Sequence, residues 1–188
     1  MQMAGFSLIA KLRNKIRVKP NNSIQIGKNT RIRYCDIYVN GNNNQLIIHD
    51  GANLKGVSIE LNGNNCLLEI GANCVIGENC FFSCREYGTK LVIGSECMFS
   101  RNVKLMTSDG HDILRDGKRI NPAKNIHIGS HVWLADNVTV LKGVSIGNDS
   151  IVGINSTVTK SLEANTVAAG NPARIIQTST DWRDVLTY

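Results

Sequence analysis

The stretch IHIGSHVWLADNVTVLKGVSIGNDSIVGINSTVTK, residues 126–160, repeats with a period of six residues. Aliphatic residues occupy every sixth position: Ile128, Leu134, Val140, Ile146, Val152 and Val158. Four residues after each of the first five comes a small side chain, at Val132, Val138, Val144, Ser150 and Ser156. This period matches neither an α-helix nor the simple alternation of a β-strand. It suits short strands joined by turns, with equivalent side chains stacked in one interior column, and therefore predicts a parallel β-helix.

The composition predicts a single globular domain with a narrow core. The 188 residues are 42% hydrophobic but only 5% aromatic, which suits stacked aliphatic side chains better than a broad aromatic core. A net charge of +6 favours anionic partners but does not indicate nucleic-acid binding. No apolar run approaches the ~20 residues of a membrane span, and the N-terminal segment does not resemble a secretory signal.

The six cysteines fit the repeat better than they fit disulfides or a metal site. Cys74, Cys80 and Cys97 each lie four residues after an aliphatic position, where later repeats have valine or serine. A cysteine at such a position behaves as a small buried hydrophobic residue, and the sequence contains no CxxC pair. We therefore expect reduced thiols and a cytoplasmic protein.

The chain is expected to divide into three segments. Residues 1–20 carry apolar residues at helical spacing, interleaved with Lys and Arg and ended by Pro20, which predicts a basic amphipathic helix. This helix is expected to cap the solenoid, and residues 1–19 also fit peripheral contact with an anionic membrane surface. Residues 21–177 are expected to form the β-helix, about seven coils of roughly eighteen residues each. Residues 178–188 form a short tail.

Asparagine-rich corners are predicted in the early coils. The sequence Asn-Gly-Asn-Asn occurs at residues 40–43 and again at residues 62–65. Asparagine and glycine tolerate the left-handed backbone that tight corners require. Stacked asparagines can also form ladders of amide hydrogen bonds between coils.

Residues 107–125, TSDGHDILRDGKRINPAKN, interrupt the repeat. A long polar excursion from a regular solenoid is usually functional. It contains His111, and an imidazole is the usual general base for activating a hydroxyl or an amine. Asp109 or a backbone carbonyl would fix the tautomer of the ring. The alternative is an exposed loop histidine without a role, and outward, solvated positions are expected for His49, His127 and His131.

Several motifs together resemble those of the bacterial hexapeptide-repeat acyltransferases. They are the sixfold repeat, Thr107–His111, Val132-Trp133-Leu134, Val158-Thr159-Lys160 and Ala169–Ala173, and the resemblance covers roughly residues 70–177. The chain is most similar to sugar O-acetyltransferases of capsule and O-antigen synthesis, and to galactoside and maltose acetyltransferases. The resemblance implies an all-β, left-handed parallel β-helix, a homotrimer with active sites between subunits, and acetyl-CoA as cosubstrate.

The same resemblance implies roles for individual residues. His111 matches the catalytic base of the family, with Asp109 in support, and Trp133 lies where relatives keep a tryptophan near the acceptor. Ser83 lies about where galactoside acetyltransferases have an acceptor-binding asparagine. Five positions are expected to contact acetyl-CoA: Ala135, through its backbone N–H, then Ile154, Thr159, Lys160 and Arg174. No metal is expected.

The function predicted from this resemblance is acetyl-CoA-dependent O-acetylation of a carbohydrate hydroxyl. A second hypothesis places a lipid-linked glycan acceptor at the inner membrane face, on the basis of residues 1–19. Three alternatives stay open. They are N-acylation of an amino sugar, a zinc carbonic anhydrase on the same fold, which requires three converging histidines, and a non-catalytic scaffold.

Overall fold

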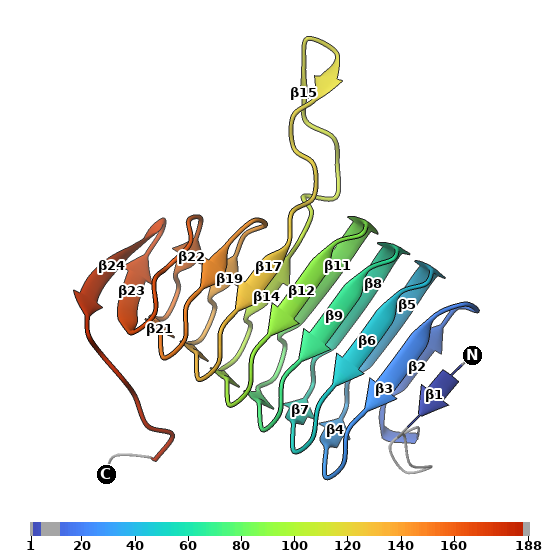
Figure 1. Ribbon diagram of the computed structural model, residues 1–188, viewed down its shortest axis with the longest axis horizontal. Helices are drawn as coiled ribbons and strands as arrows, with labels where there is room; N and C mark the ends of the chain where they lie inside the picture. The colour runs from blue at the N-terminus through green and yellow to red at the C-terminus, as the bar shows by residue number, and fades with distance from the viewer. Residues whose placement is uncertain (1, 5–11, 186–188) are drawn as a thin grey trace.

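The computed structural model describes residues 2–4 and 12–185, which wind into a parallel β-helix with three sheets along its sides (Figure 1). Sheet A contains β1 (Gln2–Ala4), β3 (Ser23–Ile26), β6 (Gln45–Ile48), β9 (Leu67–Ile70), β12 (Lys90–Ile93), β17 (Ile126–Ile128) and β20 (Ser145–Ile146). Sheet B contains β2 (Lys15–Val18), β5 (Asp36–Asn42), β8 (Ser58–Asn64), β11 (Phe81–Tyr87), β14 (Lys104–Met106), β19 (Thr139–Val140) and β22 (Thr157–Val158). Sheet C contains β4 (Arg31–Arg33), β7 (Asn53–Lys55), β10 (Val75–Ile76), β13 (Met98–Phe99), β18 (Trp133–Leu134), β21 (Ile151–Val152), β23 (Thr166–Gly170) and β24 (Ala173–Thr178).

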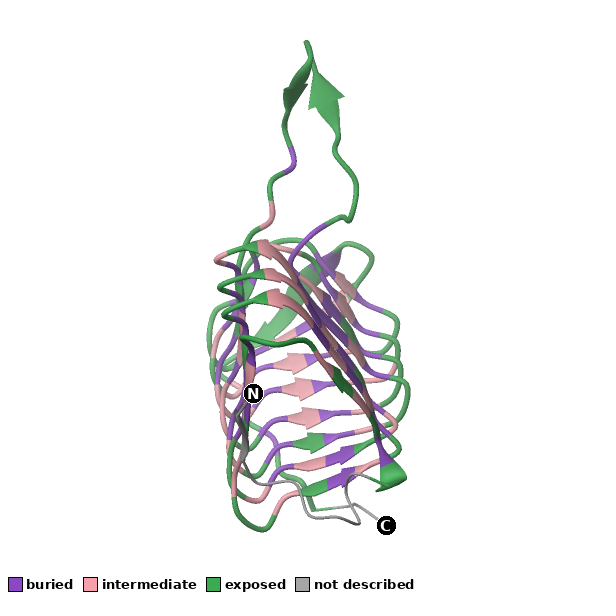
Figure 2. Cartoon of the chain, turned by 90° about the vertical axis from the view of Figure 1, so that its right-hand side faces the viewer, coloured by how far each residue is buried: buried purple, intermediate pink, exposed green. Residues whose placement is uncertain are grey.

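The chain visits the sheets in the order A, C, B, so each coil has an A–C, a C–B and a B–A corner. The hexad aliphatics fall one to a sheet: Ile128 in A, Leu134 in C and Val140 in B, all fully buried. Buried residues follow the inner side of every sheet in Figure 2. The predicted interior columns and a solenoid of about seven coils are confirmed. Burial of Cys74, Cys80 and Cys97 in this core is confirmed, and the other three cysteines are also free and buried.

The expected coil length of roughly eighteen residues holds only for the C-terminal coils. In the N-terminal half, Ser23 pairs with Gln45 and Gln45 with Leu67, so these coils contain 22 residues. In the C-terminal half, His127 pairs with Ser145, which gives the expected 18. The longer coils have longer strands in sheet B, because the asparagine-rich segments extend β5 and β8 instead of turning at once.

The asparagine corners are confirmed. Asn43 and Asn65 adopt left-handed conformations, with φ of 56° and 58°. Asn40 pairs in register with Asn62, and its Nδ2 donates to the side-chain oxygen of Asn62 at 2.9 Å. These amides therefore tie one coil to the next along the axis.

In the described part of residues 1–20, Leu12 and Arg13 are helical, but the rest does not form the predicted helix. Gln2–Ala4 is strand β1, paired with β3, and Lys15–Val18 is strand β2, paired in parallel with β5. Ile16 and Val18 alternate with charged neighbours and pack against the core, so a β-strand suits them and the solenoid begins before residue 21. Residues 5–11 lie outside the described residues. Among those described, no helix has the length and hydropathy to cross a bilayer.

The excursion loop leaves the solenoid after β14 and returns at β17, so it projects from the B–A corner (Figures 1 and 2). Its tip is a small antiparallel hairpin of β15 (Leu114–Arg115) and β16 (Lys118–Arg119). The C-terminal end is simpler: β24 folds back antiparallel to β23, and the tail beyond it runs back along the solenoid.

Candidate functional site

His111 lies on the exposed part of the loop, and one buried amide holds its backbone. Asn121, which is only 7% exposed, donates from Nδ2 to the carbonyl oxygen of His111 (2.8 Å) and to Oδ2 of Asp109 (2.7 Å). Its Oδ1 accepts a hydrogen bond from the backbone N–H of Ile113 (2.7 Å). Because one side chain bonds the chain on both sides of His111, it fixes the position from which the imidazole projects.

Asp109 is bound by a cation from the next coil. Its carboxylate accepts a hydrogen bond from Nζ of Lys142, which also donates to the carbonyl of Asn121 (2.9 Å). Lys142, followed by the Asn121 amide, holds the pKa of Asp109 below its ordinary value, so this carboxylate is ionised at neutral pH. Direct orientation of the His111 ring by Asp109 stays a prediction. The link that the structure makes between them runs through Asn121 to the His111 carbonyl.

Three of the predicted residues line one groove at the C–B corner. Trp133, Ala135 and Ile154 enclose about 410 Å³, together with Gly77, Ser100, Arg101 and Asp136. Trp133 is half-buried there, and its Nε1 donates to Oγ of Ser100 at 3.4 Å. Arg101 forms an ion pair with Asp136 (2.6 Å) and keeps the pKa of that carboxyl below its ordinary value. These two charged residues of the groove therefore neutralise each other.

One predicted detail of this groove is wrong. The backbone N–H of Ala135 donates to the carbonyl of Val152 at 3.0 Å, as part of the bonding between neighbouring coils. It is therefore not free to meet a ligand, and Ala135 offers the groove a small side chain beside the exposed Ile154.

The remaining predicted residues lie elsewhere. Thr159 and Lys160 follow β22 and are exposed at the B–A corner, on the same edge of the solenoid as the loop. Arg174 lies exposed on β24, beyond the last coil. Ser83 lies in β11, is 3% exposed, and has its Oγ 3.5 Å from Oε2 of Glu60, so it presents little surface to an acceptor.

Within one chain, His111 and the groove occupy different edges of the solenoid. The loop leaves between β14 and β17, at the B–A corner, whereas Ala135 and Ile154 lie between sheets C and B. The structure therefore brings Trp133, Ala135 and Ile154 together, but it places His111 with Thr159 and Lys160. One chain thus holds the predicted residues in two separate groups.

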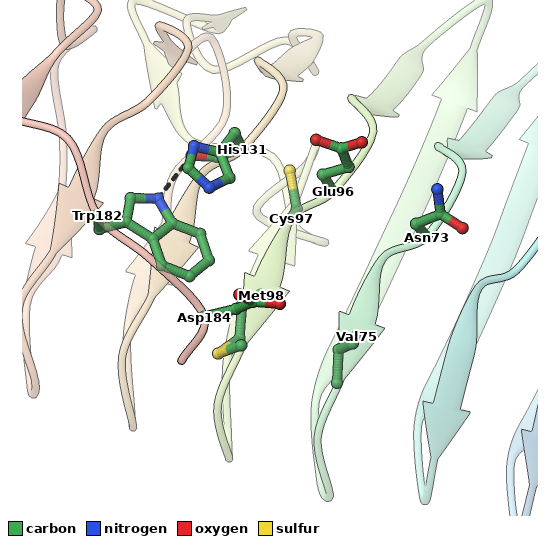
Figure 3. Close-up of a pocket in the computed structure, with 8 residues that line it drawn as sticks. All are labelled: Asn73, Val75, Glu96, Cys97, Met98, His131, Trp182 and Asp184. Atoms are coloured by element: carbon green, nitrogen blue, oxygen red, sulfur yellow. Dashed lines mark hydrogen bonds between the residues drawn. The ribbon is translucent and has the colours of Figure 1, made fainter. Parts of the chain in front are cut away.

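The C-terminal tail reaches the outer side of sheet C next to the groove. Nε1 of Trp182 donates to the carbonyl of His131 at 2.7 Å, and the two rings stack with centroids 4.4 Å apart (Figure 3). The ring centroids of Trp182 and Trp133 lie 5.8 Å apart. Below it is a second hollow of about 310 Å³, lined by Asn73, Val75, Glu96, Cys97, Met98, His131, Trp182 and Asp184.

The zinc anhydrase alternative gains no support from the histidines. Among the described residues, the side chains that converge closely enough for a metal ion are those of His131, Asp149 and Asp181. This group contains one histidine, whereas the anhydrase chemistry requires three. His127 lies on β17 and His111 on the loop, so neither joins His131.

A parallel β-helix built from six-residue repeats, with a histidine on an excursion loop and a groove at another corner, defines the class of hexapeptide-repeat acyltransferases. The chain belongs to this family, and its fold is the left-handed β-helix that the resemblance implied. The crystal structure of the polySia-specific acetyltransferase NeuO is 31% identical with a TM-score of 0.77, covering 93% of this chain and 84% of that one. No family model matches the chain.

Two other comparisons bear on function. A polysialic acid O-acetyltransferase of Neisseria meningitidis is 40% identical over 125 residues, which is 65% of this chain. The match spans 57% of that relative, little more than half of its length. A galactoside acetyltransferase solved in complex with coenzyme A is 27% identical with a TM-score of 0.51, covering 68% of this chain and 66% of that one.

Sequence reasoning missed the residues that brace the loop. Glu86 and Lys142 contact the loop from neighbouring coils, and Asn121 bonds within it, at positions that no local motif marks. Arg101 and Asp136, in the groove, meet because neighbouring coils stack in register, and the loop between them makes their separation 35 residues. Their contact could have been predicted only by aligning the repeats on the two sides of the loop.

Proposed function

We propose that this protein transfers an acetyl group from acetyl-CoA to a hydroxyl of a carbohydrate. The observation that carries the proposal is the placement of His111. It is an exposed imidazole on a braced loop, in a chain that belongs to the hexapeptide-repeat acyltransferases. The relatives named as polysialic acid O-acetyltransferases support a sialic-acid polymer or a similar bacterial glycan as the acceptor.

His111 acts as general base in this proposal. The imidazole takes the proton of the acceptor hydroxyl as that oxygen attacks the carbonyl carbon of the thioester. The C–O bond forms, the C–S bond breaks, and the imidazolium returns its proton to the departing thiolate. Trp133, whose indole N–H is a donor only, would serve beside the acceptor or the developing oxyanion.

The groove fits the pantetheine arm of acetyl-CoA. Its floor is the small side chain of Ala135, and Trp133 and Ile154 supply apolar walls for methylene groups. Lys160 and Arg174 are exposed cations suited to the phosphates at the nucleotide end, with Thr159 as a neighbouring hydroxyl. The galactoside acetyltransferase bound to coenzyme A supports this choice of donor.

We further propose that the functional unit is a homotrimer. A closed ring of three copies would bring the B–A corner of one chain against the C–B corner of its neighbour. The loop of one subunit would then face the groove of the next, which completes a site that one chain holds only as two halves.

The cellular location is proposed to be the cytoplasm, supported by six free cysteines and by the use of acetyl-CoA. Contact of residues 1–19 with an anionic membrane, and with it a lipid-linked acceptor, stays a prediction. It rested on a continuous helix, and residues 15–18 form part of sheet B instead.

Replacing His111 with Ala tests the mechanism directly. Turnover, followed by release of free CoA thiol, should fall by ~10²–10⁴ because the base is lost, while CoA binding and thermal stability stay unchanged. His49→Ala is the matched control, because His49 is also exposed but is bound to Glu69 on sheet A. Equal turnover in His111→Ala and the wild type would rule out this mechanism.

The acceptor is tested with a panel. Polysialic acid, neutral capsular oligosaccharides and amino sugars with free amines are each supplied with acetyl-CoA, and the products are mapped by NMR. Acetyl esters are the expected products. Amide products alone would favour the N-acyltransferase alternative.

A further inference from the structure

Both stems of the excursion loop converge on the carboxylate of a single residue, Glu86. Ser108, on the outgoing stem, donates from Oγ to Oε1 at 2.6 Å. Arg119, on the returning stem, donates to both oxygens: Nη2 lies 2.6 Å from Oε1 and Nη1 lies 2.8 Å from Oε2. The backbone N–H of Ala123 lies 3.4 Å from Oε2. Four donors from two separate stretches of the loop thus meet on one anion.

The backbone of Glu86 adopts a left-handed conformation at a corner of the solenoid. The residue lies at the B–A corner, one coil before the loop, and adopts a φ of +76°. Such a conformation is uncommon for a residue with a Cβ atom and marks a position that the surroundings hold in place. Arg119, as first cause, and then Ser108 and Ala123 lower the pKa of Glu86 to about 2, so the anion persists across the range in which proteins work.

From Glu86 a short path of hydrogen bonds leads to His111. Nη2 of Arg119 also donates to the carbonyl oxygen of Asn121 at 3.2 Å. The side chain of Asn121 in turn donates to the carbonyl of His111 at 2.8 Å. On the opposite side, Lys142 donates to the same Asn121 carbonyl from the next coil. The loop is therefore held by Glu86 from the coil before it and by Lys142 from the coil after it, with Asn121 between them.

We propose that Glu86 is a positioning residue for His111, acting through Arg119 and Asn121 to hold the loop where the imidazole can reach the acceptor. The inference rests on the proposed function, because it assigns Glu86 a role in the same reaction. Residues 109–120 of the loop are exposed, so the loop gains little rigidity from a hydrophobic core. Misplacement of a catalytic group by about 1 Å costs up to about 100-fold in rate.

Glu86→Gln is the decisive variant. The glutamine keeps the size of the side chain, but it offers one acceptor oxygen to four donors and turns an N–H₂ group toward Arg119. We expect kcat to fall about 10- to 100-fold, with KM for acetyl-CoA changed less than about twofold. Arg119→Lys, which keeps the charge but loses the bidentate hydrogen bond, should give an intermediate loss of kcat.

Glu78→Gln is the matched control. Glu78 also forms an ion pair on a coil corner, with Lys55 at 2.6 Å, but it does not touch the loop. Its removal should leave kcat unchanged. Hydrogen–deuterium exchange of residues 107–113 should accelerate in Glu86→Gln and not in Glu78→Gln, and this readout does not depend on activity.

A double variant separates positioning from general damage. If Glu86 acts through His111, adding Glu86→Gln to His111→Ala should cause no further loss of residual turnover. A further loss of the full 10- to 100-fold would overturn the inference, as would wild-type kcat or unchanged exchange in Glu86→Gln alone. If His111→Ala instead keeps wild-type turnover, the proposed function fails, and the exchange data still decide whether Glu86 holds the loop.

Discussion

At the scale of single residues, the chemistry at the loop depends on contacts that the local sequence does not reveal. His111 could be singled out because it is the one histidine in a polar break of the repeat. Glu86 could not, because its partners are 22 to 37 residues away and meet it only when coils stack in the correct register. The role of Asn121 could not be predicted from sequence either, since it depends on burial at the base of an otherwise exposed loop.

The ionisation of Glu86 makes a prediction about pH. Its pKa in the folded chain is lowered to about 2, against about 4.3 in an unfolded chain. Stability from the contacts of Glu86 is therefore fully present above about pH 4.3 and is lost as the pH falls through about 2. Exchange protection of residues 107–113, corrected for intrinsic rates, should stay constant from about pH 7.5 to about pH 4.5. Protection should then fall as the pH drops from about 4.3 toward about 2, and protection that stays constant across this lower range would show that the pKa of Glu86 keeps its ordinary value.

At the scale of elements, the repeat specified the C-terminal coils fully and the N-terminal coils only in outline. Residues 126–160 keep strict six-residue spacing, and the aliphatic residue at every sixth position, from Ile128 to Val158, is buried as predicted. In the earlier coils, the asparagine segments lengthen β5 and β8 by forming ladders of hydrogen bonds between coils. The spacing of the aliphatic residues does not predict these longer strands. The N-terminal segment misled for a related reason: Leu12 and Ile16 are spaced like one face of a helix, although Ile16 and Val18 also alternate as in a strand.

Strand β2 can be tested by comparing two substitutions. Ile16 pairs with the fully buried Ile37 and packs against the core, whereas Leu12 is 80% exposed. Ile16→Asp should lower the free energy of unfolding by about 1–3 kcal/mol, because it places a carboxylate against apolar side chains. Leu12→Asp should change it by less than about 0.5 kcal/mol. Urea titrations give both values, and equal losses would favour the helical arrangement in which the two residues share a stripe.

At the scale of the whole molecule, the order in which the chain visits its three sheets separates the two halves of the site. Family resemblance predicted both halves, the loop histidine and the groove, but one chain places them at the B–A and C–B corners. The proposed ring of three identical chains would resolve this separation, because each B–A corner would meet the C–B corner of a neighbour. Light scattering should then give three times the monomer mass of 20.6 kDa.

Complementation between two inactive variants tests whether the site is shared. His111→Ala removes the base and leaves the groove intact, whereas Ala135→Trp fills the groove and leaves the loop intact. Each variant alone should be inactive. Mixed trimers, co-expressed with two different tags and purified through both, contain one interface at which an intact loop faces an intact groove. They should therefore show about one third of wild-type turnover. Mixed trimers without activity would mean that both halves of the site come from one chain, since no combination of these variants restores such a site.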